Sequence, residues 1–203
     1  MFTGIISHIG TVQNINHIND WEICISIIED DGLNTVLFKK SIVIGSSIAC
    51  SGICLTVKKI KDNLFFFDVS NETASKTNFS TWKIGSQINI EKSLKVGDEI
   101  GGHFVYGHVD TIANISKIEK IEGSYKLTFI IDNFFSKFFA TKGSVTVDGV
   151  SLTVNEVEGN IFCINVIPFT WSNTCFSSYK VGSIVNIEID ILARYLEKLN
   201  TNI

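Results

Sequence analysis

The chain contains an internal repeat, and this repeat restricts the possible folds more than any other feature of the sequence. The segment 53–57, Ile-Cys-Leu-Thr-Val, recurs 97 residues later at 150–154 as Val-Ser-Leu-Thr-Val. The same offset carries Asn-Ile-Glu at 89–91 onto Asn-Ile-Glu at 186–188. The first residues also match, at an offset of 103, which places Gly4 on Gly107. A fixed offset held from about position 48 to position 91 indicates a duplicated structural unit. Two copies of about 100 residues are each long enough for a small domain.

Within each copy the local patterns predict β-strands. The repeated segments alternate side chains between two faces and are rich in β-branched and aromatic residues, with glycines between the runs. Many short strands with regular turns favour a small closed barrel in each copy. We expect a first domain at 1–102, a second at 103–187 and a C-terminal helix at 188–203. Pro168, the only proline, is expected at a strand end or edge.

Two segments carry a helical pattern. Residues 133–140 predict a short helix with Asn133 as its N-cap. Residues 189–199 predict a longer helix with an apolar stripe. The stripe has two interpretations, docking on the chain's own barrel or association with the same helix of other subunits. Its members are Leu192, Tyr195, Leu196 and Leu199.

Composition excludes several classes of function. The net charge is −4 and no block of Lys or Arg stands out, which argues against a nucleic-acid surface. No apolar run is long enough to span a membrane, and the first residues lack the pattern of a signal peptide. The five cysteines are irregularly spaced, so we expect no disulfide framework and a reducing cytoplasm.

Five segments in order along the chain resemble the riboflavin synthase family. They are Met-Phe-Thr-Gly-Ile-Ile at 1–6, Gly-Ile-Cys-Leu-Thr-Val at 52–57, Gly-Gly-His-Phe-Val-Tyr-Gly-His-Val at 101–109, Asp-Gly-Val-Ser-Leu-Thr-Val at 148–154 and Asn-Ile-Glu-Ile-Asp at 186–190. The resemblance implies an all-β fold of two tandem six-stranded antiparallel barrels, followed by a C-terminal helix that gathers three chains into a homotrimer. It also implies a site between the N-terminal barrel of one chain and the C-terminal barrel of another.

The resemblance implies a specific reaction as well. A four-carbon unit passes between two molecules of 6,7-dimethyl-8-ribityllumazine, giving riboflavin and 5-amino-6-(D-ribitylamino)uracil. Neither a metal nor a redox cofactor is required, and association with lumazine synthase is a further expectation. Early steps remove a proton from the 7-methyl group and add a nucleophile at C7.

By the same resemblance, five residues are expected to take part in the chemistry: Cys54, His108, Ser151, Thr153 and Asp190. His108 is the candidate for proton transfer because imidazole titrates near neutral pH, while Cys54, Ser151 and Thr153 would position or activate groups near the ring. Substrate contacts are expected from two sets of residues. The first copy supplies Gly4, Ile5, Ile6, Ser47, Cys54, Leu55, Thr56, Asp68, Val69, Ser70, Asn71, Glu72 and Thr73. The second copy supplies Gly107, His108, Val109, Lys142, Ser151, Leu152, Thr153, Asn165, Val166, Ile167, Pro168, Phe169 and Thr170.

The two copies must differ, because one substrate donates carbon and the other accepts it. The positions that differ are Cys54 against Ser151, Ile5 against His108, Ser93 against Asp190 and Gly45 against Lys142. Each has a purely structural alternative. A lone cysteine is commonly a small buried apolar residue, Asp190 can cap the C-terminal helix, and Lys142 can be a solvated turn residue. His103 fits either a pocket or a turn hydrogen bond.

Three residues depart from the family pattern: Ser51 where asparagine is common, Tyr106 where a small residue is common, and Phe169 where a polar one is common. A zinc site from Cys50, Cys54, His103 and His108 is disfavoured because no CxxC pair is present. Two other functional classes compete with the enzyme. A non-catalytic lumazine- or flavin-binding antenna protein would keep the barrels, and a barrel that binds nucleic acid or protein fits the strands but not the acidic charge.

Overall fold

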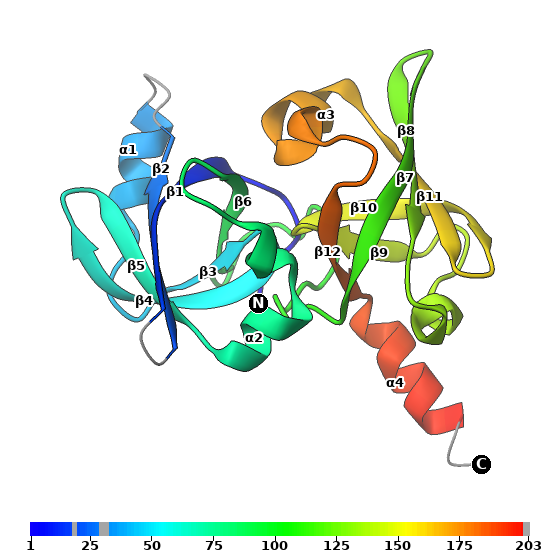
Figure 1. The fold of residues 1–203 in the computed structure, drawn as a ribbon, viewed down its shortest axis with the longest axis horizontal. Helices are drawn as coiled ribbons and strands as arrows, with labels where there is room; N and C mark the ends of the chain where they lie inside the picture. Colours follow the sequence, from blue (N-terminus) through cyan, green and yellow to red (C-terminus); the bar gives the residue numbers. More distant parts are fainter. Residues whose placement is uncertain (18–19, 29–32, 201–203) are drawn as a thin grey trace.

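The computed structural model describes residues 1–17, 20–28 and 33–200, and it consists of two closed six-stranded antiparallel barrels and a C-terminal helix (Figure 1). The first barrel has the strand order β1-β2-β5-β4-β3-β6. Its strands are β1 (His8–His17), β2 (Trp21–Ile27), β3 (Ser47–Cys50), β4 (Ile53–Lys61), β5 (Leu64–Val69) and β6 (Gln87–Lys92). The predicted all-β fold with two tandem barrels is therefore confirmed.

The second barrel repeats the topology of the first, with the order β7-β8-β11-β10-β9-β12. Its strands are β7 (Thr111–Ile121), β8 (Ser124–Ile130), β9 (Ser144–Val147), β10 (Val150–Glu158), β11 (Ile161–Val166) and β12 (Ile184–Ile189). Even the irregularities recur. Each copy has a bulge in its first strand, after Val12 and Ile115, and another in its fourth strand, after Val57 and Val154.

The hairpin turns of β3–β4 and β9–β10 show why these loops have their sequences. Ser51 and Gly52 have φ of 43° and 81°, and Asp148 and Gly149 have φ of 45° and 81°. Two-residue hairpin turns with positive φ at both positions suit the twist of the strands and favour a small polar residue followed by glycine. Ser51 therefore takes the conformation that asparagine commonly takes in such turns.

Each barrel has a hydrophobic core of its own. The alternating burial along β5 sends Phe65 and Phe67 inward. In the second barrel Phe129 stacks on Phe162 with ring centroids 4.8 Å apart. Burying one such ring contributes about 1.5–3 kcal/mol, so each copy closes around apolar side chains from its own strands.

Short helices connect the strands at equivalent places in the two copies. α2 (Asn71–Lys76) and the 3₁₀ turn η1 (Asn78–Thr81) correspond to α3 (Pro168–Asn173) and η3 (Cys175–Ser178). The helix α1 (Leu33–Lys40) and the 3₁₀ turn η2 (Asn133–Phe138) precede β3 and β9. Two sequence predictions need correction here. Pro168 begins α3 directly after β11, because proline suits the first turn of a helix. The predicted helix at 133–140 is a 3₁₀ turn whose cap is Asp132, since its carboxylate accepts from the Phe134 N–H at 2.8 Å.

The last helix, α4 (Ile191–Asn200), projects away from the second barrel (Figure 1). Asp190 caps it, with Oδ1 accepting from the Leu192 N–H at 2.9 Å, so the structural interpretation of Asp190 is confirmed. The apolar stripe of α4 is exposed: Leu192, Tyr195, Leu196 and Leu199 each keep 61–65% of their surface. The stripe therefore does not dock on the chain's own barrel. No helix in the described ranges combines the length and the apolarity needed to cross a membrane.

Two extended segments cross between the barrels, residues 1–7 and residues 103–109. They pair antiparallel at their centre, where the Phe2 N–H donates to the Val105 carbonyl at 2.7 Å and the Val105 N–H donates back at 3.1 Å. Both side chains are completely buried. Reciprocal asparagines add a second contact between the barrels, because Asn89 Nδ2 donates to the Asp148 carbonyl and Asn186 Nδ2 to the Ser51 carbonyl. The contacts between the two copies are thus reciprocal.

Candidate active site

A buried glutamate anchors each crossing segment to its own barrel. Glu91 on β6 accepts from the N–H groups of Thr3 at 2.7 Å and Gly4 at 3.0 Å. Glu188 on β12 accepts from three successive N–H groups, at 2.6 Å, 2.8 Å and 3.1 Å along residues 106–108. Burial raises the pKa of both carboxyl groups, and these backbone donors oppose the rise. The glutamates therefore fix the backbone of both segments.

A glycine in each crossing segment contacts the barrel of the other copy. The Cys54 N–H donates to the Gly107 carbonyl at 2.9 Å, and the Ser151 N–H donates to the Gly4 carbonyl at 2.8 Å. The two glycines have φ of 75° and 78°. A Cβ on Gly107 would lie 2.5 Å from Cys54 Cβ, and a Cβ on Gly4 would lie 2.5 Å from Ser151 Cβ. Only glycine meets both the conformation and the close approach.

This arrangement brings the histidine of the second copy to the first barrel. A cavity of about 200 Å³ lies where β4, α2 and the 103–109 segment meet. Six of the residues predicted from the sequence line it: Cys54, Glu72, Thr73, Gly107, His108 and Val109. The sequence analysis did not identify Ile53, Lys76 and Thr77, which complete the wall.

A cavity of about 380 Å³ lies beside β10, β11 and α3 of the second barrel. It overlaps the repeat-equivalent place, since its Ser151 and Thr170 correspond to Cys54 and Thr73 of the first cavity. Its predicted residues are Ser151, Leu152, Thr153, Asn165, Ile167 and Thr170. It also involves Gly101, Gly102, Ser144 and Asn155, which had not been singled out. Other hollows exist, one of about 440 Å³ beside β6 and one of about 520 Å³ between the barrels. The pair of cavities at β4 and β10 is nevertheless the better candidate because Cys54, His108 and Ser151 line it, three of the side chains that differ between the copies.

His103 is the most informative residue that sequence reasoning left open. Its Nδ1 lies 2.7 Å from Ser151 Oγ, and its Nε2 lies 3.2 Å from the buried Thr146 Oγ1. Burial lowers the pKa of His103, an effect that the charge of Asp190 opposes. In the neutral ring, an Nε2–H that donates to Thr146 leaves Nδ1 to accept from the Ser151 hydroxyl. A Ser-His pair thus forms at the second cavity. The sequence feature that could have pointed to it is a histidine directly after two glycines, at 101–103.

The thiol of Cys54 differs chemically from the hydroxyl of Ser151. Burial raises the pKa of Cys54, and a hydrogen bond with Ser47 opposes the rise. A raised pKa keeps the group as a thiol at neutral pH, which makes it a weak nucleophile. The buried Cys50 is shifted further, because complete burial raises its pKa and the neighbouring Cys54 adds to the rise. Cys54 therefore suits a positioning contact at the first cavity better than covalent attack.

Several predicted residues lie away from both cavity walls. Leu55, Val69 and Val166 are buried in the barrel cores, and Ile6 packs against the core of the second barrel. Asp68 forms an ion pair with Lys58 at 2.5 Å. The remaining members of this group that the structure does not bring to the walls are Ile5, Thr56, Asn71, Pro168 and Phe169.

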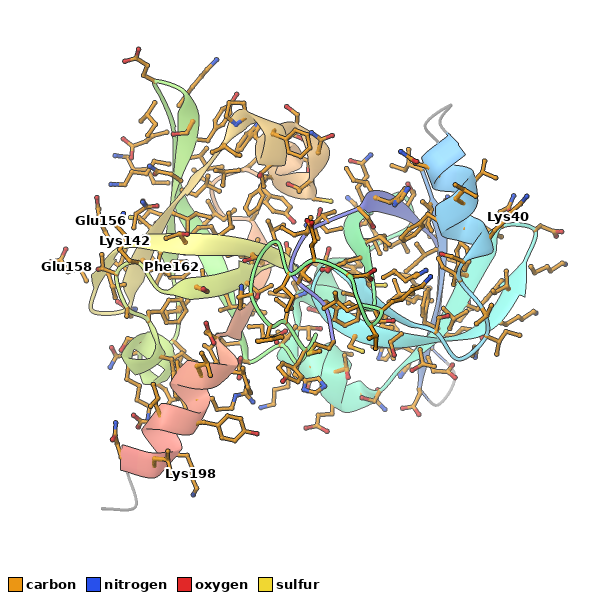
Figure 2. All side chains as sticks on the ribbon, turned by 180° about the vertical axis from the view of Figure 1, so that it is seen from behind. Lys40, Lys142, Glu156, Glu158, Phe162 and Lys198 are labelled. Carbon is orange, nitrogen blue, oxygen red and sulfur yellow. The ribbon has the colours of Figure 1, made fainter. Side chains whose placement is uncertain are left out.

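Local structure accounts for three others. Ser70 caps α2, its Oγ accepting from the Thr73 N–H at 3.1 Å. Lys142 is an exposed turn residue with φ of 70°, on the outer side of the second barrel, away from the junction between the barrels (Figure 2). Asp190 reaches the second site only through its charge on His103.

The residues of the disfavoured zinc interpretation separate between the two barrels. His103 lies against Ser151 on the second barrel, whereas His108 lines the cavity of the first. Within residues 1–17, 20–28 and 33–200, no three histidine, cysteine or acidic side chains gather closely enough to hold a metal ion. The first cavity offers thiol, carboxylate, ammonium, hydroxyl and imidazole groups to a ligand, and the second offers hydroxyl and amide groups.

Comparison with known proteins agrees with the duplication. A family model described as the lumazine binding domain matches residues 3–93 and again residues 106–190. A riboflavin synthase of Photobacterium phosphoreum is 42% identical over 200 residues, covering 98% of this chain and 88% of that protein. A riboflavin synthase of Brucella abortus (strain 2308) is 40% identical over 204 residues, covering 98% of each. The crystal structure of LumP complexed with 6,7-dimethyl-8-(1'-D-ribityl) lumazine superposes with a TM-score of 0.81 at 23% identity, covering 93% of this chain and 99% of LumP.

Proposed function

The chain belongs to the riboflavin synthase family of lumazine-binding proteins, and from this premise we propose that it converts two molecules of 6,7-dimethyl-8-ribityllumazine into riboflavin and 5-amino-6-(D-ribitylamino)uracil. It is accordingly an enzyme of the transferase type, acting in riboflavin biosynthesis. In the proposed reaction a four-carbon unit leaves one lumazine and joins the other. The atoms of two substrate molecules equal those of the two products, so the reaction needs no co-reactant.

The duplicated cavity is the observation that carries the proposal. A dismutation requires two like molecules in a fixed mutual orientation, and orientation alone can supply effective molarities of about 10⁵ M or more. The cavities lie in two barrels of the same topology and share two corresponding positions, Cys54 with Ser151 and Thr73 with Thr170. One nevertheless presents a thiol and a histidine, and the other a Ser-His pair. Corresponding positions with different chemistry suit one donor and one acceptor of the same structure.

The proposed roles follow from these groups. His108 takes the proton of the 7-methyl group in the first cavity, and Cys54 positions the ring there. Ser151, held by His103, activates a nucleophile for C7 in the second cavity, with Thr153 beside it. Asp190 acts through the charge it places near His103. The polar walls around Thr73, Asn165 and Thr170 hold the ribityl chains.

We further propose that the two-substrate site forms between chains of a homotrimer. No described residue lines both cavities. Two substrates bound in the cavities of one chain would therefore share no contacting residue. The exposed apolar stripe of α4 offers a surface for association with its copies in other chains. Sedimentation velocity tests this. A trimer is expected for the intact chain and smaller species for a Leu192→Asp, Leu196→Asp variant, whereas a trimer that survives both substitutions would exclude α4 as the contact.

A cytoplasmic location and association with lumazine synthase belong to the same proposal.

The test of function is direct. The purified protein is incubated with 6,7-dimethyl-8-ribityllumazine without added metal or cofactor, and riboflavin is followed by absorbance and chromatography. One riboflavin for every two lumazines consumed is expected. Tight lumazine binding without product would overturn the proposal in favour of an antenna protein.

Two histidine variants supply the matched comparison. His108→Ala is expected to lower turnover by about 10²-fold or more, the typical contribution of general acid–base catalysis. His17→Ala removes a histidine that stacks on Trp21 at the surface of the first barrel, 4.2 Å between ring centroids, and should leave turnover unchanged. Equal turnover in both variants would remove His108 from the chemistry.

A further inference from the structure

Asp110 joins the segment that carries His108 to two other elements. Its N–H donates to the Ile187 carbonyl at 2.8 Å, and its Oδ2 accepts from the Ile189 N–H at 2.8 Å. Its Oδ1 accepts from Arg194 Nη2 on α4 at 2.5 Å. The Asp110 side chain is 11% exposed and that of Arg194 is 41% exposed, so the carboxylate end of the contact is largely shielded from water.

The opposite end of this contact is also fixed. Asp190 caps α4 through the Leu192 N–H at 2.9 Å, and the Arg194 N–H donates to the Asp190 carbonyl at 3.3 Å. Arg194 therefore extends from the anchored first turn of the helix. Its guanidinium, always charged at neutral pH, can hold a carboxylate in one position.

The first copy lacks this device. Ser7 stands where Asp110 stands, by the offset of 103 that relates the start of the copies. Its N–H donates to the Ile90 carbonyl at 3.1 Å, as that of Asp110 does to Ile187, but its hydroxyl also returns to Ile90. Ile5 takes the place of His108 in this copy. The second anchor is thus present only in the copy whose crossing segment carries a histidine.

We propose that the Asp110–Arg194 ion pair positions His108 over the cavity of the first barrel, by tying the crossing segment to helix α4. The inference rests on the proposed function of His108. Glu188 holds the backbone at 106–108, and Asp110 holds it two residues after the histidine. With both anchors the imidazole has little freedom to shift. Without Arg194 the segment keeps its bonds to Glu188, Ile187 and Ile189 but loses its contact with α4. A small misplacement of a reacting group lowers rate more than binding.

The experiment is a double-mutant cycle between Arg194→Ala and His108→Ala, measured as kcat and KM for the lumazine. Arg194→Ala is expected to lower kcat by about tenfold with KM changed less than twofold. In the His108→Ala background it should cause no further loss, because the residue it positions is gone. Equal losses in both backgrounds would overturn the proposal, since general damage to the fold lowers activity additively.

Two further variants separate positioning from stability. Lys137→Ala removes a second ion pair of α4, Lys137–Glu197 at 2.6 Å, which ties the helix to η2 rather than to the His108 segment. It should leave kcat unchanged, and a loss equal to that of Arg194→Ala would refute the assignment. Arg194→Lys keeps the charge and should restore part of kcat.

Amide hydrogen exchange at residues 106–108 reads the position of the segment without turnover. Arg194→Ala should speed this exchange and Lys137→Ala should not. Unchanged exchange in Arg194→Ala would overturn the positioning role, whether or not the chain forms riboflavin. The absence of riboflavin in the unmutated chain would refute the proposed function and leave the exchange result standing.

Discussion

Replacing Gly107 by alanine tests the crossing arrangement most directly. Gly107 has φ of 75°, its carbonyl accepts from the Cys54 N–H at 2.9 Å, and a Cβ there would lie 2.5 Å from Cys54 Cβ and 2.9 Å from Cys54 N. Contacts this short, made to backbone, cannot be relieved by turning a flexible side chain. Gly107→Ala must therefore lift the segment away from β4.

The expected cost can be assembled from three contributions. A left-handed conformation costs an alanine about 1–2 kcal/mol. Forcing a methyl group into a filled site costs about 1–3 kcal/mol, and weakening the hydrogen bond to Cys54 costs about 1 kcal/mol. The free energy of unfolding should fall by roughly 3–6 kcal/mol in total.

Gly123→Ala is the matched control. Gly123 has φ of 74°, nearly the same as Gly107, but a Cβ there meets nothing within 4 Å. Its substitution therefore includes only the conformational cost of about 1–2 kcal/mol, and the effect of alanine on the unfolded chain is common to both variants. Urea unfolding should separate the two by about 2–4 kcal/mol. Equal losses would refute the close approach of Gly107 to Cys54.

Three further outcomes are expected. Burial raises the pKa of Asp148 to about 7, so the folded state holds a proton that the unfolded chain releases near pH 4, and stability should fall as pH rises from about 4 to about 7. Asp148→Asn should flatten this dependence in urea titrations at several pH values, and a slope unchanged in the variant would contradict the assignment. His103→Ala should lower kcat about tenfold with KM nearly constant, because Ser151 loses its partner at 2.7 Å; steady-state kinetics decide. Phe162→Ala, 1% exposed, should cost about 3–5 kcal/mol in thermal unfolding, whereas Phe169→Ala, 74% exposed, should change stability by less than about 0.5 kcal/mol.

The repeat in the sequence was enough to predict two barrels, because strand patterns and turn glycines are local properties. Alternation along segments such as Ile-Cys-Leu-Thr-Val specifies which side chains face inward. The turns at 51–52 and 148–149 follow from residues that tolerate positive φ. The details of helices were less accessible: Pro168 begins α3, and Asp132 rather than Asn133 caps the turn at 133–138. Competing caps one residue apart differ too little in sequence to be separated.

The candidate site could be predicted only in part. The analysis of the repeat identified Cys54, Thr73, His108 and Ser151. The residue at Thr73 is the same in both copies, whereas those at Cys54, His108 and Ser151 differ between the copies. Lys76 and Thr77 were missed because they reach the cavity through α2, a helix too short to leave a periodic pattern. Leu55 and Val69 were included with their segments, yet they face the core, since alternate residues of a strand point to opposite sides.

What the sequence determined by itself was the duplication, the strands of each copy and the residue types available for chemistry, all of which depend on neighbours along the chain. Only the tertiary structure decided which copy contributes residues to which cavity. Through the crossing segments, His108 of the second copy lines the cavity of the first barrel, and Gly4 of the first copy contacts Ser151 of the second. His103 likewise gained its meaning only from Ser151 and Thr146, residues more than 40 positions away in sequence. These contacts depend on how two closed barrels pack around buried glutamates and glycines, and no local pattern in the sequence specifies such packing.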